Sequence, residues 1–285
     1  MPQSSTTEIR HLTPALLYTA FMAGGESIIR CKDHLNKINV FPVPDADTGT
    51  NMASTMRSIM ENSTVSSTLK ETMNSIAESA LRGARGNSGI IFAQFIHGVR
   101  AEITHAKQID LRDFAATIKN AVSYVYESVL DPAEGTIITV IEPWAAAVET
   151  HHPTAKDFGD LLKKSMAAAR DSLMRTPEKL KILAAHHVVD AGAQGFVSFL
   201  EGVVSQIKKN RLYLNPVPAA PEAMLPSGHT ADAAADITHR FCTEALLSGA
   251  AEDADSIRTR LSSRGDSLIV AGSRETMHIH LHTNE

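Results

Sequence analysis

The sequence is poor in several features that would each point to a particular class of protein. Aromatic residues make up only 5% of the 285, and the two cysteines, Cys31 and Cys242, lie far apart in the chain. Two such cysteines form no disulfide framework, which suits a reducing cytoplasm. The net charge of −5 comes without a basic stripe. The composition therefore gives no support for nucleic-acid binding.

Long apolar runs are also missing. No stretch is long enough to span a bilayer, and the N-terminus has no apolar segment behind basic residues. We therefore expect neither a transmembrane segment nor a signal peptide. Hydrophobic residues still make up 43% of the chain. Because aromatic residues are scarce, we expect a core built mostly from Ala, Leu, Ile, Val and Met, which favours packed helices.

Helical patterns dominate the chain before residue 210. Thr13-Pro14 predicts a helix start, because a capping hydroxyl precedes a proline at the first helical position, and Thr176-Pro177 repeats this pattern. Pro143 lies inside one pattern, where we expect a kink or a break. Eight or nine helices are predicted, starting at Thr13 and Thr176 and covering about 50–60, 71–81, 88–103, 111–130, 136–150, 157–174 and 195–209.

The composition changes after the helical region. Residues 214–235 are rich in Pro and Ala without periodicity, which predicts a linker between a helical domain at 1–213 and a small α/β unit at 236–285. A unit of about 50 residues is marginal alone, so we expect it to be the incomplete start of a larger domain. Its elements are predicted at 241–247, 251–260, 267–271 and 277–282.

Asp45 and Asp47 carry the clearest chemistry. They follow the rigid segment Pro42-Val43-Pro44 and precede a predicted helix. Mg²⁺ prefers carboxylate oxygens, and a helix N-terminus offers backbone N–H groups to phosphate. The loop therefore predicts a magnesium and ATP-phosphate site, whereas the alternative is a helix cap that binds nothing. Three further polar groups follow: Thr48, Thr50 and Asn51.

A second segment suited to phosphate is the glycine-rich Arg82–Gly89, which opens another helix. Glycines let the backbone approach a phosphate closely, and Ser88 can donate a hydrogen bond to it. Alone, this segment could equally be a flexible loop. Glu134–Thr136 and Asp190–Gly195 lie at two more helix starts, so a nucleotide site is favoured. Neither G-x-G-x-x-G nor a Walker pattern occurs, which excludes Rossmann and P-loop sites.

The segment Leu35–Met52, which contains Asn-Val-Phe-Pro-Val-Pro-Asp-Ala-Asp-Thr-Gly-Thr-Asn, resembles the signature of the bacterial fatty acid kinase family. The nucleotide-binding domain of that family is homologous to the L subunit of dihydroxyacetone kinase. The match continues at 83–89, 134–140 and 189–195, and covers about residues 10–210. The region from Cys242 to Asn284 resembles the start of the family's middle domain.

This resemblance implies a mainly α fold, an antiparallel barrel of eight or nine helices with ATP or ADP and two Mg²⁺ ions at one open end. Asp45 and Asp47 match the family's metal-binding carboxylates, and Asn39 is a candidate third ligand. The residues implied to surround the nucleotide are Thr48, Gly49, Thr50, Asn51, Gly86, Asn87, Ser88, Gly89, Thr136, Asp190 and Gly192.

The resemblance also implies a function. Family members phosphorylate the carboxylate of a fatty acid held by a separate or fused acyl-binding protein of the DegV type, and a homodimer is expected. A carboxylate is ionised at pH 7, so its attack needs no general base. Two alternatives stay open: a kinase for a small molecule like dihydroxyacetone, and a nucleotide-bound regulatory module without turnover. The acyl-chain preference is expected to belong to the partner.

Ala46 replaces the glycine that the family usually has between the two aspartates. If this position has a positive φ angle, alanine costs about 1 kcal/mol or more and can shift the carboxylates. Weak metal binding would follow. Ala46 and the incomplete C-terminal unit therefore keep the regulatory alternative open. They are also consistent with a chain that has no activity by itself.

Three histidines, His278, His280 and His282, alternate along a predicted strand and therefore share one face. One thiolate from Cys242 and two of these imidazoles would suit Zn²⁺. The resemblance favours Cys242, His280 and His282 as the ligands. The alternative is a polar strand face beside a buried cysteine, because the spacing lacks the paired pattern of a zinc finger.

Overall fold

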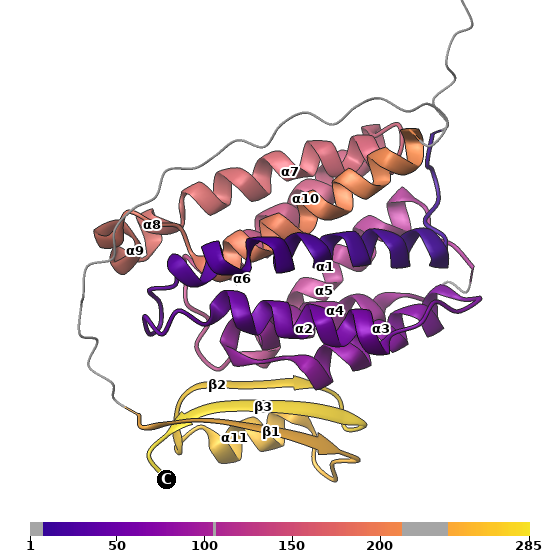
Figure 1. Ribbon diagram of the computed structural model, residues 1–285. Helices are drawn as coiled ribbons and strands as arrows, with labels where there is room; N and C mark the ends of the chain where they lie inside the picture. The colour runs from indigo at the N-terminus through magenta and orange to yellow at the C-terminus, as the bar shows by residue number, and fades with distance from the viewer. Residues whose placement is uncertain (1–7, 105–106, 213–238) are drawn as a thin grey trace, which may run out of the picture.

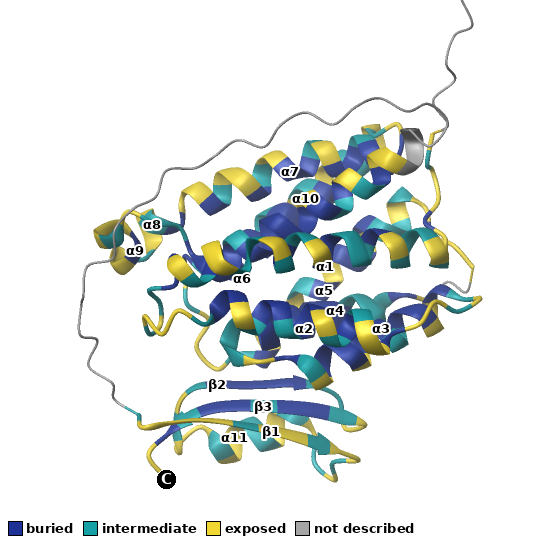
Figure 2. Cartoon of the chain, in the orientation of Figure 1, coloured by how far each residue is buried: buried dark blue, intermediate teal, exposed yellow. Residues whose placement is uncertain are grey.

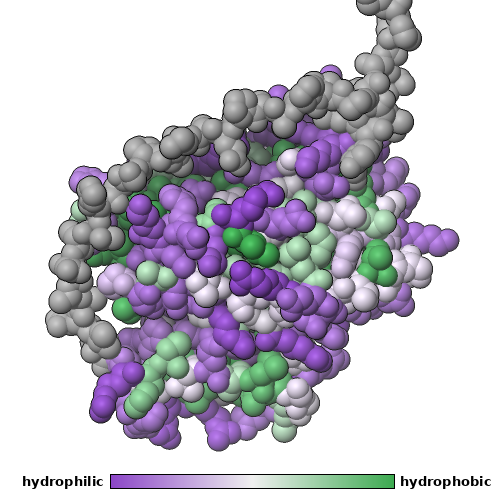
Figure 3. All heavy atoms as spheres, viewed as in Figure 1, coloured by the Kyte–Doolittle hydropathy of each residue, from purple (hydrophilic) through white to green (hydrophobic). Residues whose placement is uncertain are grey.

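The computed structural model describes residues 8–104, 107–212 and 239–285. The predicted linker at 214–235 lies outside the described residues. None of the helices in the described ranges carries an apolar stretch long enough to cross a bilayer. The face in Figure 3 is mostly hydrophilic, and its hydrophobic residues form small separate groups.

In the described part of the chain, eight long helices form a closed ring. Each helix contacts the next, and the last returns to pack against the first (Figure 1). The mainly helical, barrel-like fold that the sequence predicts is therefore confirmed. The eight helices are α1 (Pro14–Lys37), α2 (Thr48–Asn62), α3 (Leu69–Gly83), α4 (Gly86–Glu102), α5 (Leu111–Ser128), α6 (Ile137–His151), α7 (Phe158–Met174) and α10 (Ala191–Leu212).

Two proline-containing patterns have different outcomes. The Thr13 hydroxyl accepts a hydrogen bond from the Leu16 N–H at 3.3 Å, as a capping residue should. Of the expected kink or break at Pro143, the break does not occur, because α6 continues through this residue. Proline leaves the carbonyl four residues earlier without its helical donor. In α6 this carbonyl belongs to Thr139, and the Ser172 hydroxyl of α7 donates to it at 2.7 Å.

Three short helices complete the described helical region. Of these, only the one that begins at Thr176 was predicted, and its sequence did not indicate that it would be short. The helix expected from Thr176 lasts for only four residues. The Thr176 hydroxyl donates to the Leu173 carbonyl and accepts from the Asp190 N–H. Thr176 thus joins the ends of two longer elements. The short helices are η1 (His152–Thr154), α8 (Thr176–Lys179) and α9 (Lys181–His186).

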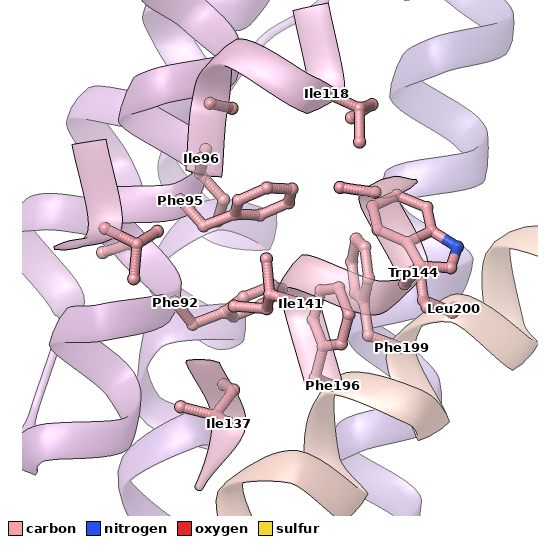
Figure 4. Packing of buried hydrophobic residues seen from close by; sticks show 14 of the residues in the cluster. Phe92, Phe95, Ile96, Ile118, Ile137, Ile141, Trp144, Phe196, Phe199 and Leu200 are labelled. Carbon is pink, nitrogen blue, oxygen red and sulfur yellow. The ribbon is translucent and has the colours of Figure 1, made fainter. Parts of the chain in front are cut away.

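Aliphatic residues make up most of the core, as expected, but five aromatic residues lie together within it. Rings from α4, α6 and α10 meet edge to face, with centroids 5.0–6.2 Å apart (Figure 4). Such contacts add about 0.5–1.5 kcal/mol each beyond burial. Buried residues of the helices lie mainly toward the inside of the ring, and exposed residues lie mainly toward the outside (Figure 2). The rings belong to Phe92, Phe95, Trp144, Phe196 and Phe199.

The C-terminal unit has the predicted elements. They are β1 (Phe241–Ser248), α11 (Ala254–Leu261), β2 (Gly265–Gly272) and β3 (Thr276–Thr283), and the antiparallel sheet has the order β1-β3-β2. Alternate residues of β2 face opposite sides: Ile269 and Ala271 join the helical core, whereas Leu268 and Val270 join a second cluster that includes Ile257 of α11. The sheet therefore lies between the helical ring and α11 (Figure 1).

Hydrogen bonds fix this unit against the ring. The Gln94 side chain of α4 accepts from the Gly272 N–H at 2.7 Å, and the Leu130 N–H donates to the Leu268 carbonyl at 3.3 Å. A bridge also pairs Val129 with Ile269. The small unit therefore packs on both faces of its sheet: Ile269 and Ala271 join the main core, and the second cluster lies against α11.

Candidate functional site

Asn39 organises the acidic loop between α1 and α2. Its side-chain oxygen accepts from the N–H of Asp47 at 3.1 Å and from the N–H and hydroxyl of Thr48 at 2.9 and 2.7 Å. Its amide nitrogen donates to the carbonyls of Phe41 and Val43. Three hydrogen bonds use the accepting capacity of this oxygen. Asn39 is therefore occupied in holding the loop, and the geometry argues against its expected role as a third metal ligand.

Ala46 has a φ angle of 55°, in the left-handed region. A residue with a Cβ atom costs about 1–2 kcal/mol in this region. Alanine at position 46, where the family usually has glycine, therefore does occupy a backbone position with a positive φ angle. The tight turn at Ala46 is also what places Asp45 and Asp47 near each other.

The two aspartates repel each other at this turn. Burial, and then the charge of Asp47, raise the pKa of Asp45 to about 6. Like charges that share a half-buried site favour protonation of one of them unless a cation is present. The pair is thus suited to a divalent cation.

The N-termini of α2 and α4 meet beside this loop. Gly86 begins α4 with a φ angle of 57°, and a Cβ atom there would collide with the Asn51 side chain of α2. At Gly89 a Cβ atom would lie 2.9 Å from the Thr55 hydroxyl. These glycines are therefore required for close packing of the two helix starts. Whether they also contact a phosphate stays a prediction.

Two other predicted residues also serve the loop. Gly49 packs against α1, where a Cβ atom would collide with the Lys32 carbonyl. The Asn36 side chain accepts a hydrogen bond from the Thr50 N–H and donates one to the Thr50 hydroxyl, both at 3.0 Å. Asn36 was not predicted as a site residue, and its distance of fourteen positions from Thr50 gives no local signal.

The starts of α6 and α10 meet at Asp190. This side chain is 6% exposed, and its carboxylate accepts from the Ala193 N–H at 2.7 Å. Burial raises its pKa to about 7, opposed by hydrogen bonds from the backbone of Ala193, Gly192 and Ile137. Next to it, a Cβ atom on Gly192 would lie 2.6 Å from the Ser88 hydroxyl. The starts of α4, α6 and α10 are therefore neighbours.

A cavity of about 380 Å³ lies at this end of the ring. It brings together four of the predicted residues, Asn87, Ser88, Thr136 and Asp190, whereas Asp45, Asp47 and residues 48–51 do not line it. Phe41 and Pro42, from the same loop as the aspartates, do line it. The cavity and the acidic loop are thus adjacent parts of one region.

The C-terminal unit forms one wall of the cavity, which the sequence did not predict. Residues 265–269 line it together with Ile137 and Ile138. Here β2 bulges between Asp266 and Ile269, and Ser267 has a φ angle of 54°. The wall depends on pairing of β2 with β3 and on contacts with the distant α5 end, so no short motif could reveal it.

The charge of the cavity restricts what it can bind. Among the described residues that line it, three are aspartates and none is Lys or Arg. A polyphosphate entering this region would need divalent cations for neutralisation. The partial positive charge of the helix N-termini adds to the attraction for anions.

A second group of candidate ligands lies on the sheet. Ligand atoms of Cys242, His280 and His282 all lie within 4.8 Å of one another. His280 Nε2 and His282 Nε2 are 3.3 Å apart, and Cys242 Sγ is 3.8 Å from His280 Nδ1. Cys242 is exposed, so the alternative of a buried cysteine is wrong. His278 points elsewhere and contacts the Leu81 carbonyl at 2.8 Å.

Carboxylates flank this cluster. Asp266 lies 3.4 Å from His282 Nδ1, and Glu244 lies 3.6 Å from His280 Nδ1. Burial works to lower the pKa of His280, but hydrogen bonds to Cys242 and Glu244 outweigh it and raise the pKa to about 9. Carboxylates in such positions commonly orient histidines that bind metals.

Comparisons with known proteins agree with this architecture. The family model "DAK2 domain" matches residues 42–205, and the model of the FakA-like middle domain of fatty acid kinase matches 238–285. An uncharacterized protein of Staphylococcus epidermidis is 31% identical over 284 residues, covering 96% of this chain and 51% of the relative. Protein YloV of Bacillus subtilis is 31% identical over 288 residues, covering 97% and 52%. The chain thus spans about half the length of these relatives.

Among solved structures, the dihydroxyacetone kinase of C. freundii in complex with AMP-PNP and Mg²⁺ matches with a TM-score of 0.50. The two sequences are 17% identical, and the match covers 72% of this chain and 36% of the other. At this identity the likeness concerns the fold. Together with the matched family models, it leads to one assignment. The chain belongs to the DAK2-domain family, as a kinase-family module related to dihydroxyacetone kinase and followed by a FakA-like middle domain.

Proposed function

We propose that this chain is the nucleotide-binding part of a cytoplasmic kinase that transfers a phosphoryl group from ATP to the carboxylate of a fatty acid. The observation that carries the proposal is the meeting of an acidic loop with the N-termini of α2, α4, α6 and α10 at one end of the ring. The fatty acid is proposed because the matching middle-domain model is that of a fatty acid kinase.

In this proposal Asp45 and Asp47 hold two magnesium ions, with Asn39 fixing the loop that carries them. When bound, magnesium neutralises charge on the β- and γ-phosphates. Ser88, Gly89 and the start of α4 face the phosphates, with the remaining predicted residues behind them. The apolar side of the cavity, including Ile137 and Leu268, suits the nucleotide base.

The chain needs no general base for this reaction. The attacking group is a carboxylate that is already ionised at pH 7. Positioning and charge neutralisation are the main requirements of phosphoryl transfer. The acyl chain would be held by a DegV-type protein or fused domain, so its length preference would belong to that partner. The homodimer also stays a prediction, which sedimentation of the purified chain can check.

A transfer assay tests the substrate. The chain is incubated with ATP, Mg²⁺ and a DegV-type protein loaded with a fatty acid, and acyl phosphate is trapped with hydroxylamine. We expect trapped product only when the loaded partner is present, and no phosphorylation of dihydroxyacetone. Phosphorylation of dihydroxyacetone instead would support the small-molecule alternative. Binding of ADP without any turnover would support the regulatory alternative.

We also propose that Cys242, His280 and His282 bind one Zn²⁺ ion. Two imidazole nitrogens bound to one tetrahedral zinc lie roughly 3.3 Å apart, and His280 Nε2 and His282 Nε2 are 3.3 Å apart. The ligand types also fit, since zinc prefers thiolate and imidazole. Zinc would stabilise the pairing of β1 with β3, because Cys242 and His282 are cross-strand partners.

A further inference from the structure

Glu244 reaches from the sheet to the start of α4. Its Oε1 atom accepts the Gly86 N–H at 2.7 Å, and the same atom lies 3.6 Å from His280 Nδ1. Its Oε2 atom lies 3.6 Å from Arg85 Nε and 3.9 Å from His278 Nε2. One carboxylate therefore contacts a candidate zinc ligand and the glycine-rich segment at the nucleotide cavity.

The position of Glu244 depends on the sheet. It is the cross-strand partner of His280, and its neighbour two residues earlier, Cys242, is the partner of His282. A metal ion held by these three ligands would join β1 to β3 at this pair and at the neighbouring pair of Cys242 and His282. The Glu244 side chain, with 23% of its surface exposed, would then have little freedom to leave Gly86.

The direction of the Gly86 N–H is linked to the positions of the residues that begin α4. It is one of the first N–H groups of α4, which have no partner inside the helix. Gly86 is in the left-handed region, and the next two residues, Asn87 and Ser88, line the cavity. Any change in the direction of the Gly86 N–H therefore moves the two side chains beside the proposed phosphates.

We propose that Glu244 is a positioning residue that couples the Cys242–His280–His282 metal site to the nucleotide cavity through its hydrogen bond to Gly86. Zinc on the sheet holds the start of α4 in the arrangement that binds nucleotide. This inference rests on the proposed zinc and nucleotide sites. It goes beyond them, because it makes affinity for nucleotide depend on a metal ion that does not touch the nucleotide.

Calorimetry of ADP binding in Mg²⁺ buffer tests the coupling. Wild type and Glu244→Ala are each measured with zinc and after zinc removal by a chelator that is then exchanged away. We expect zinc removal to weaken ADP binding to wild type about tenfold, within the usual range of coupling between sites. In Glu244→Ala, ADP binding should be weak in both states, with less than a twofold effect of zinc.

Two further variants make the test specific. Glu275→Ala is the matched control, because Glu275, in the turn between β2 and β3, also pairs with a residue of α4, but that residue is Arg100, 4.0 Å away near the other end of the helix. It should behave as wild type. Glu244→Gln keeps an oxygen for the Gly86 N–H, so its ADP affinity should stay within about threefold of wild type.

Hydrogen exchange of the segment 84–88 provides a readout that needs no nucleotide. Exchange there should become faster in Glu244→Ala and in zinc-free wild type, but not in Glu275→Ala. Binding is reciprocal at equilibrium, so Mg²⁺-ADP should strengthen zinc binding by the factor found in calorimetry. Circular dichroism and the zinc content of each variant are measured alongside.

Several outcomes would overturn the coupling. The first is that zinc removal from wild type changes neither the ADP affinity nor the hydrogen exchange of residues 84–88. The second is that zinc removal weakens ADP binding to Glu244→Ala as much as to wild type. The third is that Glu244→Gln and Glu244→Ala lose ADP affinity equally. Loss of zinc from Glu244→Ala would make Glu244 a ligand and also contradict the proposal. If wild type binds no ADP in either state, the proposed nucleotide site fails, while hydrogen exchange still decides whether zinc holds the start of α4.

Discussion

The two candidate metal sites differ in how the chain builds them. Asp45 and Asp47 are two residues apart and are held by a turn, with hard oxygen donors. Cys242 and His282 are distant in sequence and meet only because β1 pairs with β3, with sulfur and nitrogen donors. The first site is a product of local sequence and the second of sheet register. Damage to the loop should therefore act locally, whereas damage to the sheet site should spread to the cavity wall.

The largest expected effect is on the zinc affinity of the sheet site formed by Cys242, His280 and His282. His280→Ala removes a buried ligand, and we expect zinc affinity to fall by more than about 100-fold, so that zinc content drops from one ion per chain to near zero. Metal analysis after gel filtration measures this. His278→Ala is the comparison, because His278 contacts Leu81 rather than the cluster. Equal zinc loss in both variants would contradict the assigned ligands.

The next effect concerns Asn39. Asn39→Ala leaves the N–H groups of Asp47 and Thr48 without their acceptor, so the free energy of unfolding should fall by about 2–4 kcal/mol. Urea denaturation measures this loss. Asn39→Asp keeps an accepting oxygen and should lose less. If Asn39→Ala unfolds at the same urea concentration as wild type, the loop is not held as described.

The smallest effect concerns Ala46. Ala46→Gly relieves the left-handed backbone but adds freedom to the unfolded chain, so we expect a net gain of about 0.5–1 kcal/mol. Ala155→Gly, where φ is −76°, should instead lose stability. The two variants are compared by urea denaturation. A loss of stability in Ala46→Gly would show that the turn does not strain alanine.

The sequence predicted those structural features that depend on residues close together in the chain. The helix start at Thr13, the acidic loop and the strands on either side of Gly272 follow from local rules. The cost at Ala46 was conditional on a positive φ angle, which only the structure supplied. The break that was one of two expectations at Pro143 does not occur, because the hydroxyl of Ser172 on another helix compensates for the missing N–H. The role of Asn36 and the cavity wall at 265–269 also depend on contacts between distant segments, which single-sequence patterns do not encode.

Calorimetry of Mg²⁺-dependent ADP and ATP binding tests the central claim most directly. Wild type is compared with an Asp45→Ala, Asp47→Ala double variant and with Asp33→Ala, which removes an exposed carboxylate from α1. We predict magnesium-dependent binding to wild type and Asp33→Ala, and at least about 100-fold weaker binding to the double variant, with all three folded by circular dichroism. Equal binding to the double variant, or no binding to wild type at millimolar nucleotide and saturating magnesium, would contradict the claim that the acidic loop forms a magnesium–nucleotide site.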